Sequence, residues 1–285
     1  MGSRISFVNC VLCRSERNMW SFADLLKNFF THKDFLPEAS KIPGTMFTGL
    51  HFVFALSCLI LVVWCAVRCS KMGEKGMRCA FFVLWVLLAV LEPSKIIWES
   101  VSGKTVSVEL TGILPLYPCS IFLYAMPLVI WGRGAVRHMG CGYVCTLGLL
   151  GGSINFIYPA NILSNYSCIS FAGFHTFFYH GAIVFCALTV LLSGYHSYKG
   201  ITKWQQLVWP AVPFLVVSLI ANCVNFSPID SDYMFFKLES FIFAPVGAAL
   251  PDGVTVLIVY AAYLLIHAAP YLPSFVANGK RKGNL

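Results

Sequence analysis

The chain has 285 residues, of which 58% are hydrophobic and only 11% charged, and its mean hydropathy is +0.75. Soluble domains carry about 25% charged residues, and a chain with so few cannot cover a surface that faces water. The composition therefore excludes an ordinary soluble enzyme and indicates an integral membrane protein. The net charge of +8 is spread over short basic clusters beside apolar runs. Topology signals and contacts to anionic lipid are distributed in this way, so we expect no nucleic-acid partner.

Residues 1–45 precede the first long apolar run and form an N-terminal tail. Within the tail, residues 20–36 predict an amphipathic helix that lies in the plane of the membrane interface. Ser21 and Asp24 have the spacing of a capping box. Apolar side chains recur on one face of this helix, namely Phe22, Leu25, Leu26, Phe29 and Phe30. A short packed lid is the alternative interpretation of the same pattern.

Seven stretches are long and apolar enough to cross a bilayer, which needs about 20 residues each. They lie near residues 46–67, 79–98, 112–132, 136–158, 171–193, 206–225 and 247–269. Because the alternating short strands of a barrel are missing, we expect helices, which satisfy their own backbone hydrogen bonds in lipid. The sequence thus predicts an all-α protein with a seven-helix transmembrane domain over residues 46–270 and no second soluble domain.

The distribution of Lys and Arg predicts the orientation of this bundle. The loops opposite the basic side contain only Lys104 and Lys237, although the N-terminal tail adds six basic residues. By the positive-inside rule the N-terminus lies outside, and residues 271–285 form a basic cytoplasmic tail. Eleven basic residues define the cytoplasmic side: Arg68, Lys71, Lys75, Arg78, Arg133, Arg137, Lys199, Lys203, Lys280, Arg281 and Lys282.

Several polar groups fall inside the predicted spans, where they are costly and are therefore candidate site residues. Cys119 stands between prolines, which remove backbone donors and open the helix. His175 and His180 are five residues apart, so an ideal helix turns them about 140° from each other. We expect one imidazole to face the centre of the bundle. Glu92 and Lys95 share a helix face and can neutralise each other, as an interfacial anchor or as a wall that contacts a phospholipid headgroup.

The twelve cysteines do not form a recognisable metal or disulfide pattern. Most lie in apolar segments, where Cys behaves as a small hydrophobic residue. Cys10 and Cys13 have the spacing of a zinc or redox motif, but no second Cys or His pair follows nearby. We expect neither a bound metal nor a cofactor.

Four short motifs give the chain a recognisable order of segments. They are Leu114-Pro-Leu-Tyr-Pro-Cys119, Asn155-Phe-Ile-Tyr-Pro159, Tyr179-His-Gly181, and Asn222 and Asn225 followed by Asp232-Tyr233. In order and spacing they resemble the YwaF-like family of bacterial membrane proteins, which is distantly similar to transmembrane protein 164, an animal phospholipid acyltransferase. The resemblance covers residues 46–270 and implies a bacterial plasma membrane. Tyr117 stands where that family commonly has His, and Asp232 where it has Asn.

Together the residues and the resemblance imply two competing functions. In the first, a phospholipid acyltransferase, Cys119 attacks an acyl ester, His180 transfers the proton, and Asn155 or Tyr158 stabilises the oxyanion. A lipid hydrolase, with water as the acceptor, is a variant of it. In the second, a transporter or lipid-binding protein uses the same groups without chemistry. Membrane phospholipids or acyl lipids are the expected partners, and the expected substrate-binding residues are Tyr117, Asn155, Tyr158, His175, Asn222 and Asn225.

Overall fold

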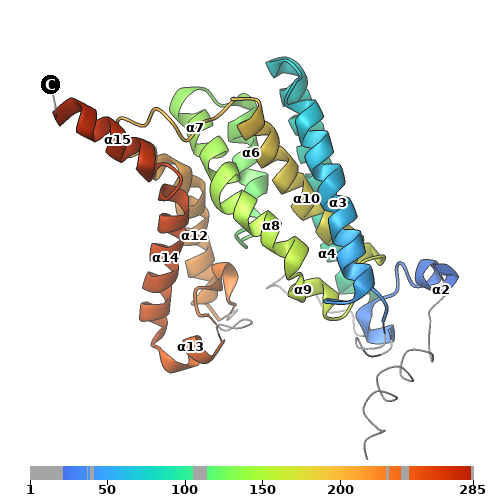
Figure 1. Ribbon diagram of the computed structural model, residues 1–285. Helices are drawn as coiled ribbons and strands as arrows, with labels where there is room; N and C mark the ends of the chain where they lie inside the picture. The colour runs from blue at the N-terminus through green and yellow to red at the C-terminus, as the bar shows by residue number, and fades with distance from the viewer. Residues whose placement is uncertain are drawn as a thin grey trace, which may run out of the picture.

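The computed structural model describes residues 22–36, 38, 42–104, 114–228, 231–238 and 244–283, and all regular structure within them is helical (Figure 1). The long helices are α3 (Gly49–Cys69), α4 (Glu74–Ser102), α10 (Phe171–Leu192), α12 (Val212–Asn225) and α14 (Asp252–Ala268). Shorter helices connect or extend them: α6 (Ile121–Trp131), α7 (Gly134–Tyr143), α8 (Leu149–Ile157), α9 (Ala160–Leu163), α11 (Gln205–Val208), α13 (Ala244–Ala249) and α15 (Leu272–Gly283). A π-helix, η3 (Val144–Gly148), joins α7 to α8, and 3-10 turns form η4 (Trp209–Ala211) and η5 (Tyr233–Phe235).

Five helical stretches within the described residues can cross a membrane, over residues 49–69, 74–102, 134–163, 171–192 and 205–225. A sixth results if α14 and α15, which meet at a bend of 64°, are counted as one span. The structure thus supports an integral membrane protein, but the predicted count of seven spans is not reached. The difference lies at the predicted span 112–132, where α6 has 11 residues and is about 16 Å long. Pro115 and Pro118 lack amide donors, which explains why the described residues 114–120 are not helical.

Helix α10 forms the centre of the bundle. About 72% of its most apolar stretch is buried, against 17% for α3 and 11% for α4. The outer faces of α3 and α4 are accordingly lined by exposed Leu, Val, Ile and Trp side chains, which suits contact with lipid. A Ser170 cap begins α10 by accepting a hydrogen bond from Gly173 N at 3.1 Å.

Small residues allow α8 to approach α10 closely. A methyl group placed on Gly152 would lie 3.0 Å from Val184 Cγ2 and 3.2 Å from the His180 carbonyl oxygen. Helices in lipid gain little from the hydrophobic effect between themselves, so such close backbone packing is a main source of association. This contact fixes the position of the middle of α10, where His180 lies.

The loops with the most Lys and Arg gather at one end of the bundle. The end of α3, the start of α7 and the end of α10 lie together at the top of Figure 1, whereas α9, α13 and α2 (Phe22–Lys27) lie at the other end. The basic loops are therefore on a common side, as a topology signal requires.

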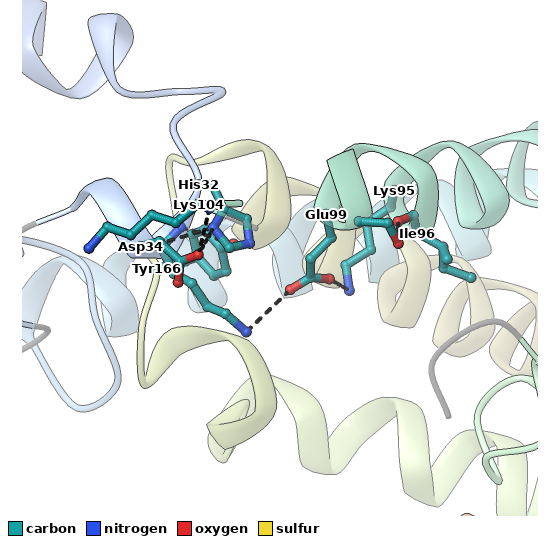
Figure 2. Close-up of polar contacts among 9 residues, drawn as sticks. His32, Asp34, Lys95, Ile96, Glu99, Lys104 and Tyr166 are labelled. Atoms are coloured by element: carbon teal, nitrogen blue, oxygen red, sulfur yellow. Dashed lines mark hydrogen bonds and ion pairs between the residues drawn. The ribbon is translucent and has the colours of Figure 1, made fainter. Parts of the chain in front are cut away.

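The described part of the predicted helix over residues 20–36 forms α2 and a 3-10 turn, η1 (Lys33–Phe35), rather than one continuous helix. Ser21 lies outside the described residues. Figure 2 shows how the segment is attached: Lys104 N donates to Asp34 Oδ2 at 3.0 Å, and Lys33 N donates to Tyr166 Oη at 3.2 Å. The segment is thus fastened to the end of α4 and to the turn that precedes α10.

Candidate functional site

Cys119 lies in the turn that precedes α6 and is partly buried. Gly151 of α8 faces it, because a methyl group on that glycine would lie 3.9 Å from Cys119 Sγ. The thiol stands where five helices converge. Its electrostatic neighbours from the other four are Glu92, Tyr143, Tyr179 and Tyr263.

The turn around Cys119 is held by hydrogen bonds to its backbone. The Tyr143 hydroxyl donates to the Pro118 carbonyl oxygen, and Ser120 N donates to Tyr117 O at 2.9 Å. Tyr143 is fully buried immediately before the π-helix η3, in which the Thr146 hydroxyl donates to Gly142 O at 2.7 Å. Single π-turns within helices often occur at functional sites. Here the π-turn follows the residue that fixes the cysteine-bearing turn.

Glu92 of α4 makes an unpredicted contact with α10. Its Oε2 atom lies 3.2 Å from His175 Nε2, within ion-pair distance but without the alignment of a hydrogen bond. Lys95, the partner expected from the sequence, instead forms an ion pair with Glu99 one turn further along α4. The carboxylate of Glu92 therefore points into the bundle instead of being neutralised on its own helix face.

His180 is buried and its ring is oriented by its own helix. Its Nδ1 atom lies 2.8 Å from the Thr176 carbonyl oxygen. Since a carbonyl only accepts, Nδ1 carries the proton, and in the neutral ring Nε2 is then an acceptor with a free lone pair. The ring packs against Tyr179 at 5.6 Å between centroids. A neutral imidazole in this tautomer is equipped to accept a proton.

Glu92 connects the two histidines to the cysteine. It is an electrostatic neighbour of His180 and of Cys119, and it contacts His175 directly. The helical phase predicted that His175 and His180 cannot aim at one point, yet both rings are buried and both interact with this carboxylate. From its spacing, Glu92 was expected to pair with Lys95, as an interfacial anchor or as a wall that contacts a headgroup, and not to join the cysteine and the histidines. The available signal was a carboxylate beside Pro93 within an apolar span.

Asn155 lies on α8, and Tyr158 directly follows its last residue. Asn155 Nδ2 donates to Gly151 O at 3.2 Å, one turn away from the glycine that faces Cys119. Tyr158 follows the end of α8, is 37% exposed and packs against the ring of Phe47 at 6.0 Å. Asn155 is therefore the nearer of the two predicted oxyanion donors along the helix.

Of the remaining predicted residues, Tyr117 and Asn225 contact the segment 231–238, and Asn222 contacts α14. Asn225 holds this segment through both ends of its amide: Nδ2 donates to Tyr233 O at 2.8 Å, and Oδ1 accepts from Tyr233 N at 2.7 Å and from the Ser231 hydroxyl at 3.1 Å. Tyr117 packs on the ring of Tyr233 at 5.0 Å. Asn222 Nδ2 donates to the Tyr260 hydroxyl at 2.8 Å, while its buried Oδ1 has no partner among the described residues.

The segment 231–238 has a strained backbone. Positive φ angles, which residues other than glycine rarely adopt, occur at Met234 (61°), Phe235 (57°) and Leu238 (55°). Such strain persists only where the surroundings enforce it, and here the hydrogen bonds of Asn225 do so. Both ends of the Asn225 amide are thus used to hold the loop whose Tyr233 ring contacts Tyr117.

The comparison with known proteins gives one match. A family model described as the TMEM164 family matches residues 45–277, which include every element from α3 to α14. No curated protein and no solved structure matches the chain. The model match spans most of the sequence and confirms the resemblance to transmembrane protein 164. The chain is an all-helical membrane protein that belongs to the TMEM164 family.

Proposed function

We propose that the protein is a phospholipid acyltransferase with Cys119 as its nucleophile and His180 as its base. The observation that carries the proposal is that Cys119, His175 and His180 share Glu92 as a neighbour inside the bundle. A group of thiol, imidazoles and carboxylate inside a membrane bundle is costly and is kept for a function. Cys119 is only partly buried, and α3 and α4 expose apolar faces, which supports a site that takes acyl chains from the membrane.

In the proposed reaction, Cys119 Sγ attacks the carbonyl carbon of a phospholipid acyl ester while His180 Nε2 accepts the thiol proton. The ester C–O bond then breaks, the lysophospholipid oxygen takes the proton from His180, and the acyl group remains on sulfur as a thioester. In the second half, the hydroxyl of an acceptor lipid attacks the thioester and gives its proton to His180, and the proton then returns to the sulfur. The acyl group moves between lipids and the enzyme is regenerated.

The remaining polar groups have distinct tasks in this scheme. One N–H of the Asn155 amide is used by Gly151 O, which leaves its second N–H for the oxyanion. A carboxylate close to the thiol disfavours the thiolate, so Glu92 must be neutralised during attack. The imidazole of His175, whose Nε2 lies 3.2 Å from Glu92 Oε2, is the group placed to do so.

The test is the covalent intermediate. Purified protein incubated with phospholipid carrying a labelled acyl chain should retain a hydroxylamine-sensitive label, and Cys119→Ala should retain none. Cys223→Ala, which removes an exposed thiol on α12, serves as the control and should retain the label. If the wild type and His180→Ala both form no adduct while still binding phospholipid, the acyl-enzyme mechanism is refuted.

That last outcome would favour the second candidate, a transporter or lipid-binding protein. The Glu92–His175 pair supports it, because such a pair can bind a polar headgroup without any covalent step. In that case Cys119→Ala should leave lipid binding unchanged. A hydrolase would instead form the adduct and release free fatty acid when no acceptor lipid is present.

We further propose that the N-terminus lies outside, the C-terminus is cytoplasmic, and residues 114–131 make a seventh crossing in which only α6 is helical. The single-sided placement of the basic loops supports this orientation (Figure 1). Single cysteines introduced at Lys199 and Lys282 should both react with an impermeant label from the cytoplasmic side. Labelling of these two positions from opposite sides would rule the topology out.

A further inference from the structure

A second polar cavity lies at the basic end of the bundle. Its volume is about 280 Å³, and it is bounded by the start of α7 and by the segment that follows α10. It is separated from Cys119 by the whole length of α6, about 16 Å for 11 residues. The proposed acyl transfer makes no use of it.

The lining of this cavity is basic. Arg137 and Lys199 both line it, and none of its lining residues is Asp or Glu. The nearest carboxylate, Glu74, is shared: its Oε1 atom lies 2.7 Å from Arg78 Nη2 and 3.4 Å from Arg137 Nη1. Lys199 is exposed and forms no ion pair with a described residue. One carboxylate for three cations leaves the cavity with an excess of positive charge.

The guanidinium of Arg137 is held in place rather than free to move. It stacks over the ring of Tyr195 at 4.7 Å. The Tyr195 hydroxyl in turn donates to Val129 O at 3.1 Å and accepts from Arg78 Nε at 3.1 Å. A fixed guanidinium fork loses little entropy when it binds an anion in a bidentate manner.

Two imidazoles also line the cavity. His138 and His196 line it with ring centroids 4.9 Å apart. Nε2 of each ring is used internally, by Gln206 O at 3.1 Å and by the Tyr271 hydroxyl at 2.7 Å. Nδ1 of each ring is therefore the nitrogen left for a ligand, and in the neutral ring of His138, whose Nε2 donates to the Gln206 carbonyl, it is an acceptor.

Backbone amides at the start of α7 also favour an anionic ligand in this cavity. Gly134 begins α7 and also lines the cavity, and the preceding residue, Arg133, makes no side-chain cap to the helix. The first amides of a helix have no acceptor within the helix, and without a side-chain cap they can donate to a ligand. The helix dipole also favours an anion at this end. Together with the cationic side chains, they surround one small volume with hydrogen-bond donors.

We propose that this cavity binds a phosphate monoester, either the headgroup of an anionic membrane lipid or a soluble phosphate compound. A phosphate group matches the guanidinium fork, the ammonium of Lys199 and the helix amides at once, whereas a neutral or zwitterionic ligand would leave the positive charge uncompensated. Lys199 also lines an adjoining cavity of about 560 Å³ beside α15, so a ligand can extend beyond its phosphate.

Full-length protein purified in detergent provides the test. Inorganic phosphate and glycerol 3-phosphate are titrated by calorimetry, and retention of phosphatidic acid is compared with that of phosphatidylcholine by native mass spectrometry. The test variant is Arg137→Gln with Lys199→Gln. The control is Lys71→Gln with Lys75→Gln, which removes the same charge from exposed positions at the same end of the bundle. Lys199→Gln alone is added because its exposed side chain has no structural role.

We expect the test variant to bind its phosphate ligand at least about tenfold more weakly, and Lys199→Gln to show part of that loss, with the control unchanged. Binding of the soluble phosphates supports the proposal with a soluble ligand. Selective retention of phosphatidic acid alone supports it with a lipid headgroup. The proposal is overturned if no probe binds, or if the control loses as much affinity as the test variant.

Discussion

Glu92 connects the residues of the candidate site, although its charge is unfavourable for a neighbouring thiolate. It contacts His175 at 3.2 Å and is an electrostatic neighbour of both Cys119 and His180. In the proposed mechanism it is a positioning residue, because it orients His175 and does not itself touch the reacting atoms.

Glu92→Gln should therefore slow acyl transfer by about ten- to a hundredfold, the cost of a lost interaction with a charged partner. The same change should speed alkylation of Cys119 by iodoacetamide, because a negative charge close to the thiolate is removed. Glu99→Gln, which removes the partner of Lys95 on the same helix, is the control and should change neither rate. Slower alkylation in Glu92→Gln would show that Glu92 does not act on Cys119 through its charge.

Burial of His196 at the basic end of the bundle makes the stability of the protein depend on pH. Burial lowers the pKa of His196 to about 4, and the nearby His138 and Arg137 act in the same direction. In the unfolded chain a histidine titrates near pH 6.5, so between about pH 6.5 and 4 the unfolded state binds more protons than the folded state. The stabilisation is complete above that window and is lost as the pH falls through it.

Thermal unfolding in detergent between pH 7 and 4 measures this loss, which amounts to about 3 kcal/mol for a single group with this shift. In His196→Gln, which retains a hydrogen-bonding group for Tyr271, the acid-induced decrease should be smaller by about that amount. An identical pH profile in the variant would contradict the assignment to His196.

At the scale of elements, sequence and structure agree where a long apolar run has a clear cap. The predicted span 171–193 corresponds to α10, Phe171–Leu192, which begins after the Ser170 cap. Prediction and structure disagree at 112–132. The span was predicted from its apolar content alone, which does not depend on the backbone donors that Pro115 and Pro118 remove. The pairing of Glu92 with His175 was also unpredictable, since it depends on how α4 packs against α10 and not on spacing along either helix.

The contact between α8 and α10 gives a prediction for these elements. Gly152→Ala places a methyl group 3.0 Å from Val184 Cγ2 and 3.2 Å from His180 O, which is tighter than an ordinary contact. These neighbours on α10 have to shift by a few tenths of an ångström, so we expect a loss of about 1 kcal/mol in stability, the low end for overpacking, and slower acyl transfer because α10 holds His180. Gly253→Ala meets no atom within 4 Å near the start of α14 and should be neutral or slightly stabilising. Equal melting temperatures for Gly152→Ala and the wild type would show that the interface between α8 and α10 accommodates the methyl group without loss of stability.

At the scale of the whole molecule, the two ends of the bundle differ in construction. The basic end holds the phosphate-sized cavity and presents Lys and Arg, whereas the other end is closed by polar contacts between segments far apart in sequence (Figure 2). There Lys33 Nζ lies 3.9 Å from Glu99 Oε1, and His32 packs on Trp98 and Tyr166. The composition predicted the membrane bundle and its basic side, but contacts that join residue 34 to residue 104 have no signature in local sequence.

The contact between Asp34 and Lys104 predicts how this closed end opens. The Lys104 backbone amide that donates to Asp34 lowers the pKa of the carboxyl below its usual value, although burial opposes the effect. The folded-state pKa is thus below the unfolded one, so the contact contributes above the usual carboxyl pKa and is lost as the pH falls through the lowered value. Asp34→Ala should remove this stabilising contact at every pH. Hydrogen exchange should then accelerate in residues 31–36 and 101–104, while the melting temperature of the bundle changes little.

The charge-matched control, Asp252→Ala at the exposed start of α14, should leave exchange in both segments unchanged. If exchange in residues 31–36 is as slow in Asp34→Ala as in the wild type, the remaining contacts of Lys33, His32 and Tyr166 hold this segment in place without the carboxylate.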